Sequence, residues 1–333
     1  MFDTGGSDRS GATKLSQLNP VLPSLLGAGC ISSSAIFVQL AHGAAGTTGF
    51  FRCALALPGL YALAWLEGRR LRRGPAPQRA PAGTGSRSLA LLAGLFLGVD
   101  LVLWTSAIYD VGAGVATVLG NLQVLFVTAI AWVVLRERPK GLFLAALPVV
   151  LVGVVLVAGL VGGSAFGRHP VAGVLYGLGT SIAYALFILV MRRATSGPKA
   201  VARSLADASA GAALAALVLG AGLGEFTFAP PLRALGWYLV LALASQTVGW
   251  LLITSSLPRL KAAVASLLLL LQPAVALVLA DVVLGQQPTG TQVLGALLVC
   301  CGVVVAATSA NKATTRTPLA KAASAKQAPA SSY

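Results

Sequence analysis

The chain has 333 residues, of which 56% are hydrophobic and only 10% are charged, and its formal net charge is +15. A soluble domain carries roughly 25% charged residues because water must wet its surface, so this composition excludes a soluble globular protein. In a soluble protein, a large positive net charge suggests binding to nucleic acid. Here the basic residues lie in short segments between apolar runs, which excludes that partner.

The N-terminal segment 1–20 is polar and lacks the basic stub, short apolar core and cleavage site of a secretory signal. We expect it to be a cytoplasmic tail. Ten apolar runs follow, each near the ~20 residues that a helix needs to cross a bilayer. The sequence predicts an all-α membrane protein with spans at 21–41, 46–66, 89–109, 113–135, 142–162, 171–191, 205–224, 235–256, 262–284 and 290–309.

The C-terminal segment 310–333 is rich in Ala, Ser, Thr, Lys and Pro and has little to bury, so we expect a disordered cytoplasmic tail. With the N-terminus inside, every Lys and Arg falls on the cytoplasmic side except Arg52, Arg168 and Arg233. Shifting the topology by one helix would scramble this asymmetry. The charges therefore predict ten spans with both termini in the cytoplasm.

The chain also repeats itself. Residues 99–159 align without a gap to 248–308, with identical residues at 21 of 61 positions. The matches include Pro139 with Pro288 and Gln123 with Gln272, which low-complexity apolar sequence does not readily produce. We therefore predict two five-helix repeats, 21–162 and 171–309.

Because five is odd, the second repeat must enter the membrane upside down. The charges agree: Arg-Glu-Arg-Pro-Lys at 136–140 is predicted inside, whereas the matching Gly-Gln-Gln-Pro-Thr at 285–289 is predicted outside. Inverted repeats of this kind are typical of secondary transporters, which bind substrate near the midplane and alternate its access.

These features resemble the EamA-type transporters of the drug/metabolite transporter superfamily. The resemblance covers about 21–309 and rests on the inverted repeat, on Arg52 in Phe51-Arg52-Cys53, and on the endings of helices 4 and 9. The chain keeps Pro273 but has Val124 at the matching repeat position, and it has Gln286 where the family often has Glu. The resemblance implies export or exchange of small metabolites, commonly amino acids or their analogues, through a central cavity in a bacterial inner membrane. A multidrug or aromatic-compound exporter is the alternative.

Polar and aromatic residues at mid-span are the candidate substrate-binding groups, since polar side chains in hydrocarbon are costly unless they are satisfied. We predict that substrate meets Asp100, Trp104, Asn121, Gln123, Tyr184, Gln246, Trp250 and Gln272. Asn121 and Gln123 lie about 200° apart on a helix, so only one of them can point squarely into a cavity.

Each of these residues has a plainer interpretation. A membrane glutamine can simply bond across to a neighbouring helix, and the tryptophans can be packing groups. Asp100 is a substrate or proton site, or a carboxyl group that bonds to another helix. Arg52 is expected to be structural or gating, snorkelling outward or binding a carbonyl or carboxylate. Asp281 is expected to be wetted or paired with Arg52.

Other classes of protein fit less well. An integral-membrane enzyme needs a nucleophile–base pair or a metal cluster, and the sequence offers only two histidines and four scattered cysteines. A channel is disfavoured because inverted repeats suit two halves that rock against each other better than they suit a permanently open pore. We expect no cofactor and no metal. The expected partners are a small-molecule substrate, the lipid bilayer and protons as candidate coupling ion, with the protein a monomer or homodimer.

Overall fold

A computed structural model of the protein describes residues 21–73, 84–135, 141–157, 169–195, 201–256 and 262–314. Within these ranges the chain is helical apart from short turns and connections, so the prediction of an all-α protein is confirmed there. The helices are α2 (Val21–Ser32), α3 (Ser34–Ala41), α4 (Ala45–Ala54), α5 (Leu57–Arg73), α6 (Thr84–Val111), α7 (Ala113–Gly120), α8 (Gln123–Leu135), α9 (Gly141–Val157), α10 (Pro170–Ala194), α11 (Val201–Gly222), α12 (Leu232–Val240), the π-helix η2 (Leu241–Gly249), α13 (Trp250–Ser256), α14 (Ala262–Leu284) and α15 (Gly290–Thr314).

Six described segments are long and apolar enough to cross a membrane: Leu22–Ala41, Ala45–Arg69, Arg87–Val111, Pro170–Ala194, Val201–Gly222 and Leu232–Ile253. Four shorter apolar helices are Ala113–Val127, Leu144–Val157, Gln272–Leu284 and Gly290–Gly302. Each predicted span overlaps one of these ten segments, although the number of spans stays a prediction. The helix α15 runs to Thr314, past the predicted end at 309. The predicted N-terminal tail, residues 315–333 and the basic stretch 136–140 lie outside the described residues.

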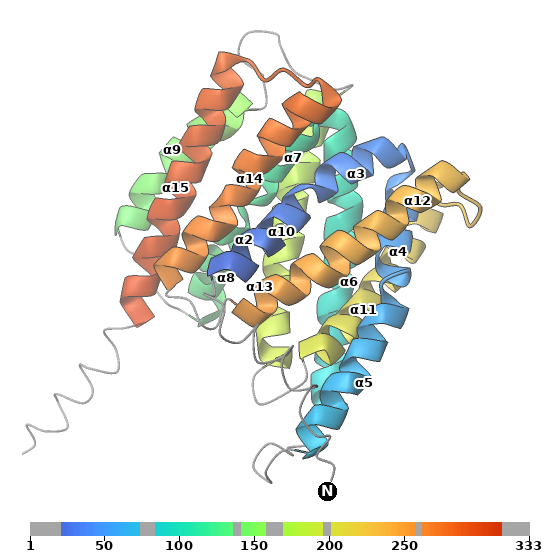
Figure 1. The fold of residues 1–333 in the computed structure, drawn as a ribbon. Coiled ribbons are helices and arrows are strands. Elements are labelled where there is room, and N and C mark those ends of the chain that lie inside the picture. Colours follow the sequence, from blue (N-terminus) through green and yellow to red (C-terminus); the bar gives the residue numbers. More distant parts are fainter. Residues whose placement is uncertain are drawn as a thin grey trace, which may run out of the picture.

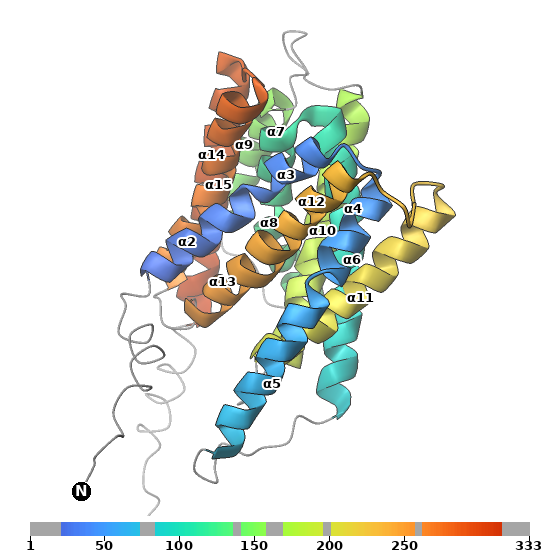
Figure 2. The same cartoon turned by 45° about the vertical axis from the view of Figure 1, so that its right-hand side comes forward.

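The helices pack side by side in one bundle (Figures 1 and 2). The helices α9 and α15 pair with each other at one side, and α4, α5 and α11 lie at the opposite side (Figure 1). Between these flanks, α6 packs along α10 and α11, while α2 packs against η2, α13 and α14. We refer to α6, α7, α10 and α11 as one helix group, and to α2, α3, α12, η2, α13 and α14 as the other helix group.

Small residues fix α6 against α11. A Cβ atom added at Gly94 would collide with the carbonyl oxygen of Ala208, and one at Gly98 would collide with that of Ala212. Within a membrane, helices associate by close backbone packing rather than by expulsion of water, so glycine at the crossing is favoured. This contact sets the position of the middle of α6, where Asp100 lies.

Asp207 on α11 holds together the end of the bundle where α5 ends and α6 and α11 begin. Its buried carboxylate accepts hydrogen bonds from Tyr61 Oη at 3.1 Å and from Arg87 Nε at 3.4 Å, and it forms an ion pair with Arg203. Nearby, the carboxylate of Glu67 accepts hydrogen bonds from the first two backbone N–H groups of α11. A carboxylate there satisfies helix donors that have no partner within the helix. We call this end of the bundle, which carries Arg87 and Arg203, the basic end.

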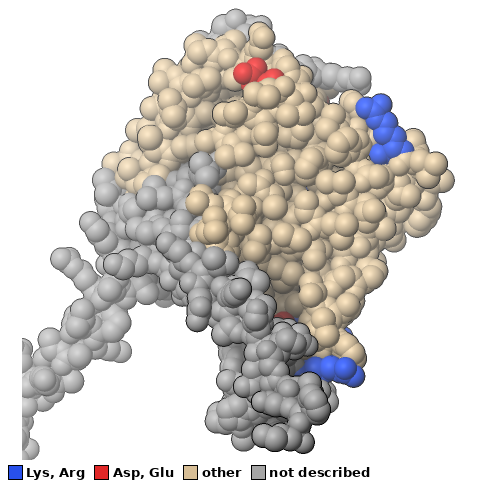
Figure 3. All heavy atoms as spheres, in the orientation of Figure 1, with Lys and Arg blue, Asp and Glu red and all other residues tan. Residues whose placement is uncertain are grey.

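Charged side chains of the described residues lie near two opposite ends on the face in Figure 3, and a broad uncharged belt separates them. Large apolar side chains in the described helices are exposed, among them Leu151 at 65% and Leu175 at 63%. A helical bundle satisfies its backbone internally and can present such a surface to lipid. The chain is a multi-pass membrane protein.

Candidate functional site

Three consecutive serines interrupt the first span. The hydroxyls of Ser32, Ser33 and Ser34 donate hydrogen bonds to the carbonyls of Ala28, Cys30 and Ile31 on the preceding turn. Such bonds from serine back to its own helix weaken the regular ladder and bend the helix. The break between α2 and α3 follows at Ser33.

Asn121 interrupts the fourth span. Its backbone N–H is shared between the carbonyls of Thr117 at 3.3 Å and Val118 at 3.2 Å, and its side-chain Nδ2 donates to the carbonyl of Thr117 at 2.9 Å. Sharing with the i−3 carbonyl tightens the turn into 3₁₀ geometry. The α-helix resumes as α8 at Gln123.

The second half of the chain contains one further interruption and a helix with an internal proline. The π-helix η2 separates α12 from α13, and Thr247 Oγ1 donates to the carbonyl of Ala242 five residues earlier, at 2.8 Å. Pro273 lies inside α14 and removes a backbone donor beside Gln272. Single π turns and broken helices occur often at functional sites, because they turn side chains and backbone polar groups towards a ligand.

A cavity with a volume of about 90 Å³ lies beside these irregular segments. That space exceeds what a single water needs, so a small ligand or several waters can enter. The lining residues come from both halves of the chain: Ile31, Ser32, Ser34, Arg52, Leu97, Asp100, Leu101, Trp104, Thr117, Gly120, Asn121, Gln123, Thr180, Tyr184, Trp250 and Gln272.

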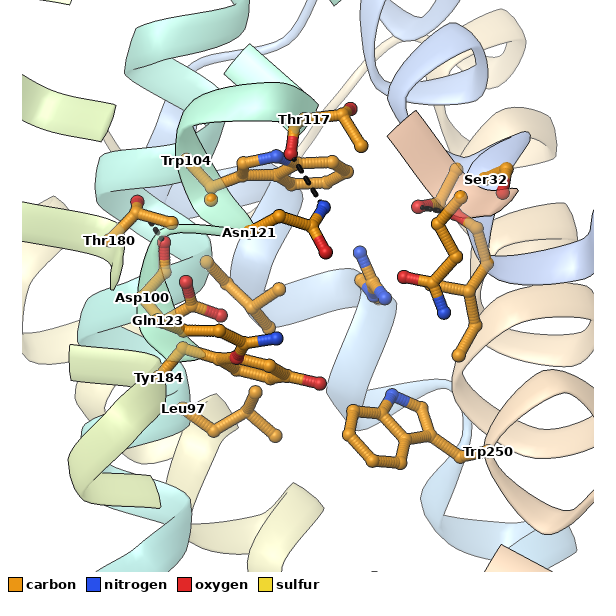
Figure 4. A pocket seen from close by; sticks show the side chains of 16 residues that line it. Ser32, Leu97, Asp100, Trp104, Thr117, Asn121, Gln123, Thr180, Tyr184 and Trp250 are labelled. Atoms are coloured by element: carbon orange, nitrogen blue, oxygen red, sulfur yellow. Dashed lines mark hydrogen bonds between the residues drawn. The ribbon is translucent and has the colours of Figure 1, made fainter. Parts of the chain in front are cut away.

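One wall of the cavity is built by α6, the α7–α8 break and α10 (Figure 4). On this wall Trp104, Asn121, Asp100, Gln123 and Tyr184 lie one below another in the view. Two contacts fix α10 to it: Thr180 Oγ1 donates to the backbone carbonyl of Asp100, and Ser181 Oγ donates to that of Leu119. Ser32 and Trp250 lie across the opening, on the opposite wall (Figure 4).

The two ionisable charges in the lining, Arg52 and Asp100, are both buried, with exposed fractions of 4% and 6%. The Arg52 guanidinium donates from Nε to Oε1 of Gln246 at 3.1 Å and lies 5.8 Å from the ring centroid of Trp104. Gln246 in turn donates from Nε2 to Ser209 Oγ at 3.0 Å. In the described part of the chain, Arg52 and Asp100 form no ion pair with each other.

Gln123 leaves a polar atom unsatisfied. Its Oε1 is buried and accepts no hydrogen bond from any described residue. Buried polar groups without a partner are costly and few in native structures, so each invites an explanation. Because Gln123 lines the cavity beside Asp100 (Figure 4), a ligand donor can supply the missing bond.

A cluster of three aromatic residues lies at the side of the cavity where Tyr184 is found. The Tyr184 ring lies 6.2 Å from that of Trp250 and 5.5 Å from that of Phe187, and the Phe187 and Trp250 rings meet edge to face. Tyr184 and Phe187 belong to α10 whereas Trp250 begins α13, so the cluster joins the two facing helix groups.

Gln286 joins the same groups at the end opposite the basic end. Its Oε1 accepts a hydrogen bond from the backbone N–H of Ala113 at 3.1 Å, at the start of α7, and its Nε2 donates to Gln39 on α3 at 2.8 Å. Gly112 takes a positive φ of 86° there, and a Cβ atom added to it would crowd the Gln286 amide. We call these two hydrogen bonds of Gln286 the Gln286 tie, and its geometry requires glycine at position 112.

Seven of the eight residues predicted to meet substrate line the cavity, and so does Arg52. Asn121 and Gln123 both line it, because the helix break at 121–122 removes the regular angle between them. The eighth, Gln246, is fully buried behind Arg52. Asp281 is exposed near the end of α14, and Arg52 binds an amide rather than that carboxylate.

Sequence reasoning missed four hydroxyl residues of the lining: Ser32, Ser34, Thr117 and Thr180. The serine run at 32–34 was the available signal for the first two. It also missed Asp207, although Arg203 and Asp207 show the i, i+4 spacing of an ion pair on a helix.

The sequence profile of the EamA-like transporter family matches residues 20–159 and again residues 171–308. The chain belongs to the EamA-like transporter family. The resemblance seen in the residues is thereby confirmed. The protein is a membrane transporter, and family membership implies a small-molecule substrate.

A solved crystal structure has a similar fold, with a TM-score of 0.56 at 18% sequence identity. The match covers 86% of this chain and 96% of that chain. At this identity the similarity concerns the fold alone. No curated protein matches this transporter.

Proposed function

We propose that this transporter exports small metabolites, such as amino acids or their analogues, by alternating access to the cavity between its two helix groups. One observation carries the proposal. A polar and aromatic cavity lies beside the α2–α3 and α7–α8 breaks, the start of α13 after η2 and the proline of α14, and both halves of the chain contribute to its lining. Broken helices around a midplane site are a recurrent arrangement in secondary transporters.

The proposed architecture is ten spans in two inverted five-helix halves, with both termini in the cytoplasm and the protein in a bacterial inner membrane. The helix pairs agree with this arrangement. The fifth and tenth spans, α9 and α15, pack on each other, and the third packs on the sixth as the first packs on the eighth. A pseudo-two-fold axis would exchange these contacts.

Alternating access requires closures that open in turn on either side of the site. The aromatic cluster of Tyr184, Phe187 and Trp250 provides one closure, towards the basic end, and the Gln286 tie provides the other. Both closures join α6, α7 and α10 to α2, α3, α13 and α14. Rocking one group against the other would break one closure while making the other.

A proton is the candidate coupling ion, with Asp100 as its carrier. The carboxylate lies in the cavity, where both sides of the membrane can reach it in turn. Ionisable residues inside membrane bundles often mark such pathways.

A second function, export of aromatic compounds or drugs, is supported by Trp104, Tyr184 and Trp250 in the lining. Aromatic rings bind apolar and cationic ligands without demanding one hydrogen-bonding pattern.

A metabolite screen tests the proposal. Cells that overproduce the protein are compared with cells that produce the Gly120→Phe variant, which fills the cavity, and internal and external pools of amino acids and toxic analogues are measured. Export predicts that the pool of at least one compound moves outward only with the unmodified protein. Equal pools for every compound in both cultures would contradict it.

A further inference from the structure

We propose that the cavity binds the zwitterionic head group of a neutral amino acid in one orientation, with the carboxylate on Arg52 and the ammonium on Asp100 and Gln123. The inference rests on the proposed transport function and adds which charges of the substrate are recognised and by which atoms. It follows from three features of the cavity.

The first feature is the way Arg52 is held. Gln246 occupies its Nε, and Gln246 is itself fixed by Ser209, so the guanidinium has a set direction. This bond leaves the two terminal Nη groups, which no described residue binds. They form a fork whose spacing suits the two oxygens of a carboxylate. The guanidinium carbon lies 5.8 Å from the ring centroid of Trp104, within the range of a cation–π contact.

The second feature is a pair of acceptors without donors. The Asp100 carboxylate has no hydrogen-bond partner among the described side chains, and Gln123 Oε1 has none either. An ammonium group carries three donors and no acceptor. It can bind the Asp100 carboxylate and the Gln123 carbonyl together, which satisfies both.

The third feature is the charge balance of the site. Arg52 and Asp100 share one cavity but form no ion pair with each other, and no other lining residue that the structure describes is a Lys, Arg, Asp or Glu. The charges of the two groups cancel, so a ligand with a single charge would bring an unbalanced charge into a buried site, which is strongly unfavourable. A zwitterion compensates both, and a net-charged side chain would upset the balance.

The side chain of the amino acid then lies towards Leu97, Tyr184 and Trp250, an aliphatic and two aromatic residues of the lining (Figure 4). Aromatic faces favour apolar and aromatic groups. We therefore expect neutral amino acids with apolar or aromatic side chains to bind best.

The test uses the full-length protein in proteoliposomes and needs no variant. Uptake of each neutral proteinogenic amino acid is measured in liposomes loaded with the same compound. The best substrate is then set against its decarboxylated amine and its deaminated acid as competitors. The zwitterion should compete at least about tenfold better than either analogue, since each lacks one charge contact.

Two variants test the assignment of atoms. Asp100→Asn should lower the preference for the amino acid over the deaminated acid, and Arg52→Gln should lower its preference over the amine, each by about tenfold. Glu225→Gln and Arg233→Gln are matched controls, because both residues are exposed and outside the cavity. Their preferences should equal that of the parent. Preferences that change together in both site variants, or in neither, overturn the assignment.

The outcomes also separate this inference from the proposed function. If the protein moves another metabolite but no amino acid, or moves the amine or the acid as well as the zwitterion, the head-group inference is wrong and transport stands. If no compound identified by the metabolite screen is moved in proteoliposomes, the proposed function fails first.

Discussion

Arg52 on α4 donates a hydrogen bond of 3.1 Å from Nε to Oε1 of Gln246 in η2, 194 residues further along the chain. The bond joins the two halves of the protein directly behind the cavity. It gives the buried guanidinium a fixed direction, and we propose that Gln246 positions Arg52; the substrate contact of Gln246 stays a prediction.

Gln246→Leu tests that role. The substitution removes the acceptor for Arg52 and the donor to Ser209, and leaves both groups buried without partners. We expect a loss of about 1–3 kcal/mol in unfolding free energy and a rise of about tenfold in the KM for the transported compound. Gln246→Glu keeps the acceptor and should largely restore KM. Gln287→Leu, at an exposed position, is the control, and an unchanged KM in Gln246→Leu would refute the positioning role.

Asp100→Asn tests proton coupling. The substitution keeps the size of the side chain but removes the group that loads and releases a proton. In proteoliposomes with an imposed pH gradient, transport by the parent should follow the gradient. The variant should still exchange substrate without a gradient, with the weaker recognition that loss of the ammonium contact implies, but it should lose the response to the gradient. A variant that responds like the parent would leave Asp100 without a coupling role.

The helix contact at Gly94 should be intolerant of larger side chains. Gly94→Leu places carbon atoms against the backbone of Ala208, so we expect a loss of roughly 1–3 kcal/mol in stability or failure to fold. Gly236 on α12 has open space around it, and Gly236→Leu should be neutral. Thermal unfolding in detergent compares the two. Equal midpoints would show that α6 and α11 are not packed as described.

The proposed topology predicts where reporter fusions end up. Fusions after Pro198 and after Ala320 should both report the cytoplasm, whereas one at His169 should report the outside. The physical reason is that basic segments stay on the inner side of the membrane. A cytoplasmic signal at His169 would contradict the inverted repeat.

The sequence predicts much of this fold because apolar runs of membrane length are its strongest pattern. It also locates most of the cavity, since polar residues such as Asp100 and Gln272 are conspicuous at mid-span. The breaks were harder to see. The π turn η2 contains no proline, and the break at 121–122 arises from local competition for backbone carbonyls.

Side-chain direction after such a break also escapes a regular helical count. A helix wheel sets Asn121 and Gln123 on different faces, yet both line the cavity. Gln246 is absent from the described lining for a related reason, since the neighbour that it meets depends on how α4 and η2 pack.

Filling the cavity tests the central claim most directly. Gly120 lines the site, and a Cβ atom there would make ordinary contacts with Thr180 and Trp104, so Gly120→Phe extends into open space. The matched control is Gly236→Phe on an exposed face of α12. Both proteins are reconstituted and exchange of a labelled amino-acid mixture is measured. We predict that Gly120→Phe folds normally and loses exchange while Gly236→Phe retains it; undiminished exchange by folded Gly120→Phe would contradict a transport pathway through this cavity.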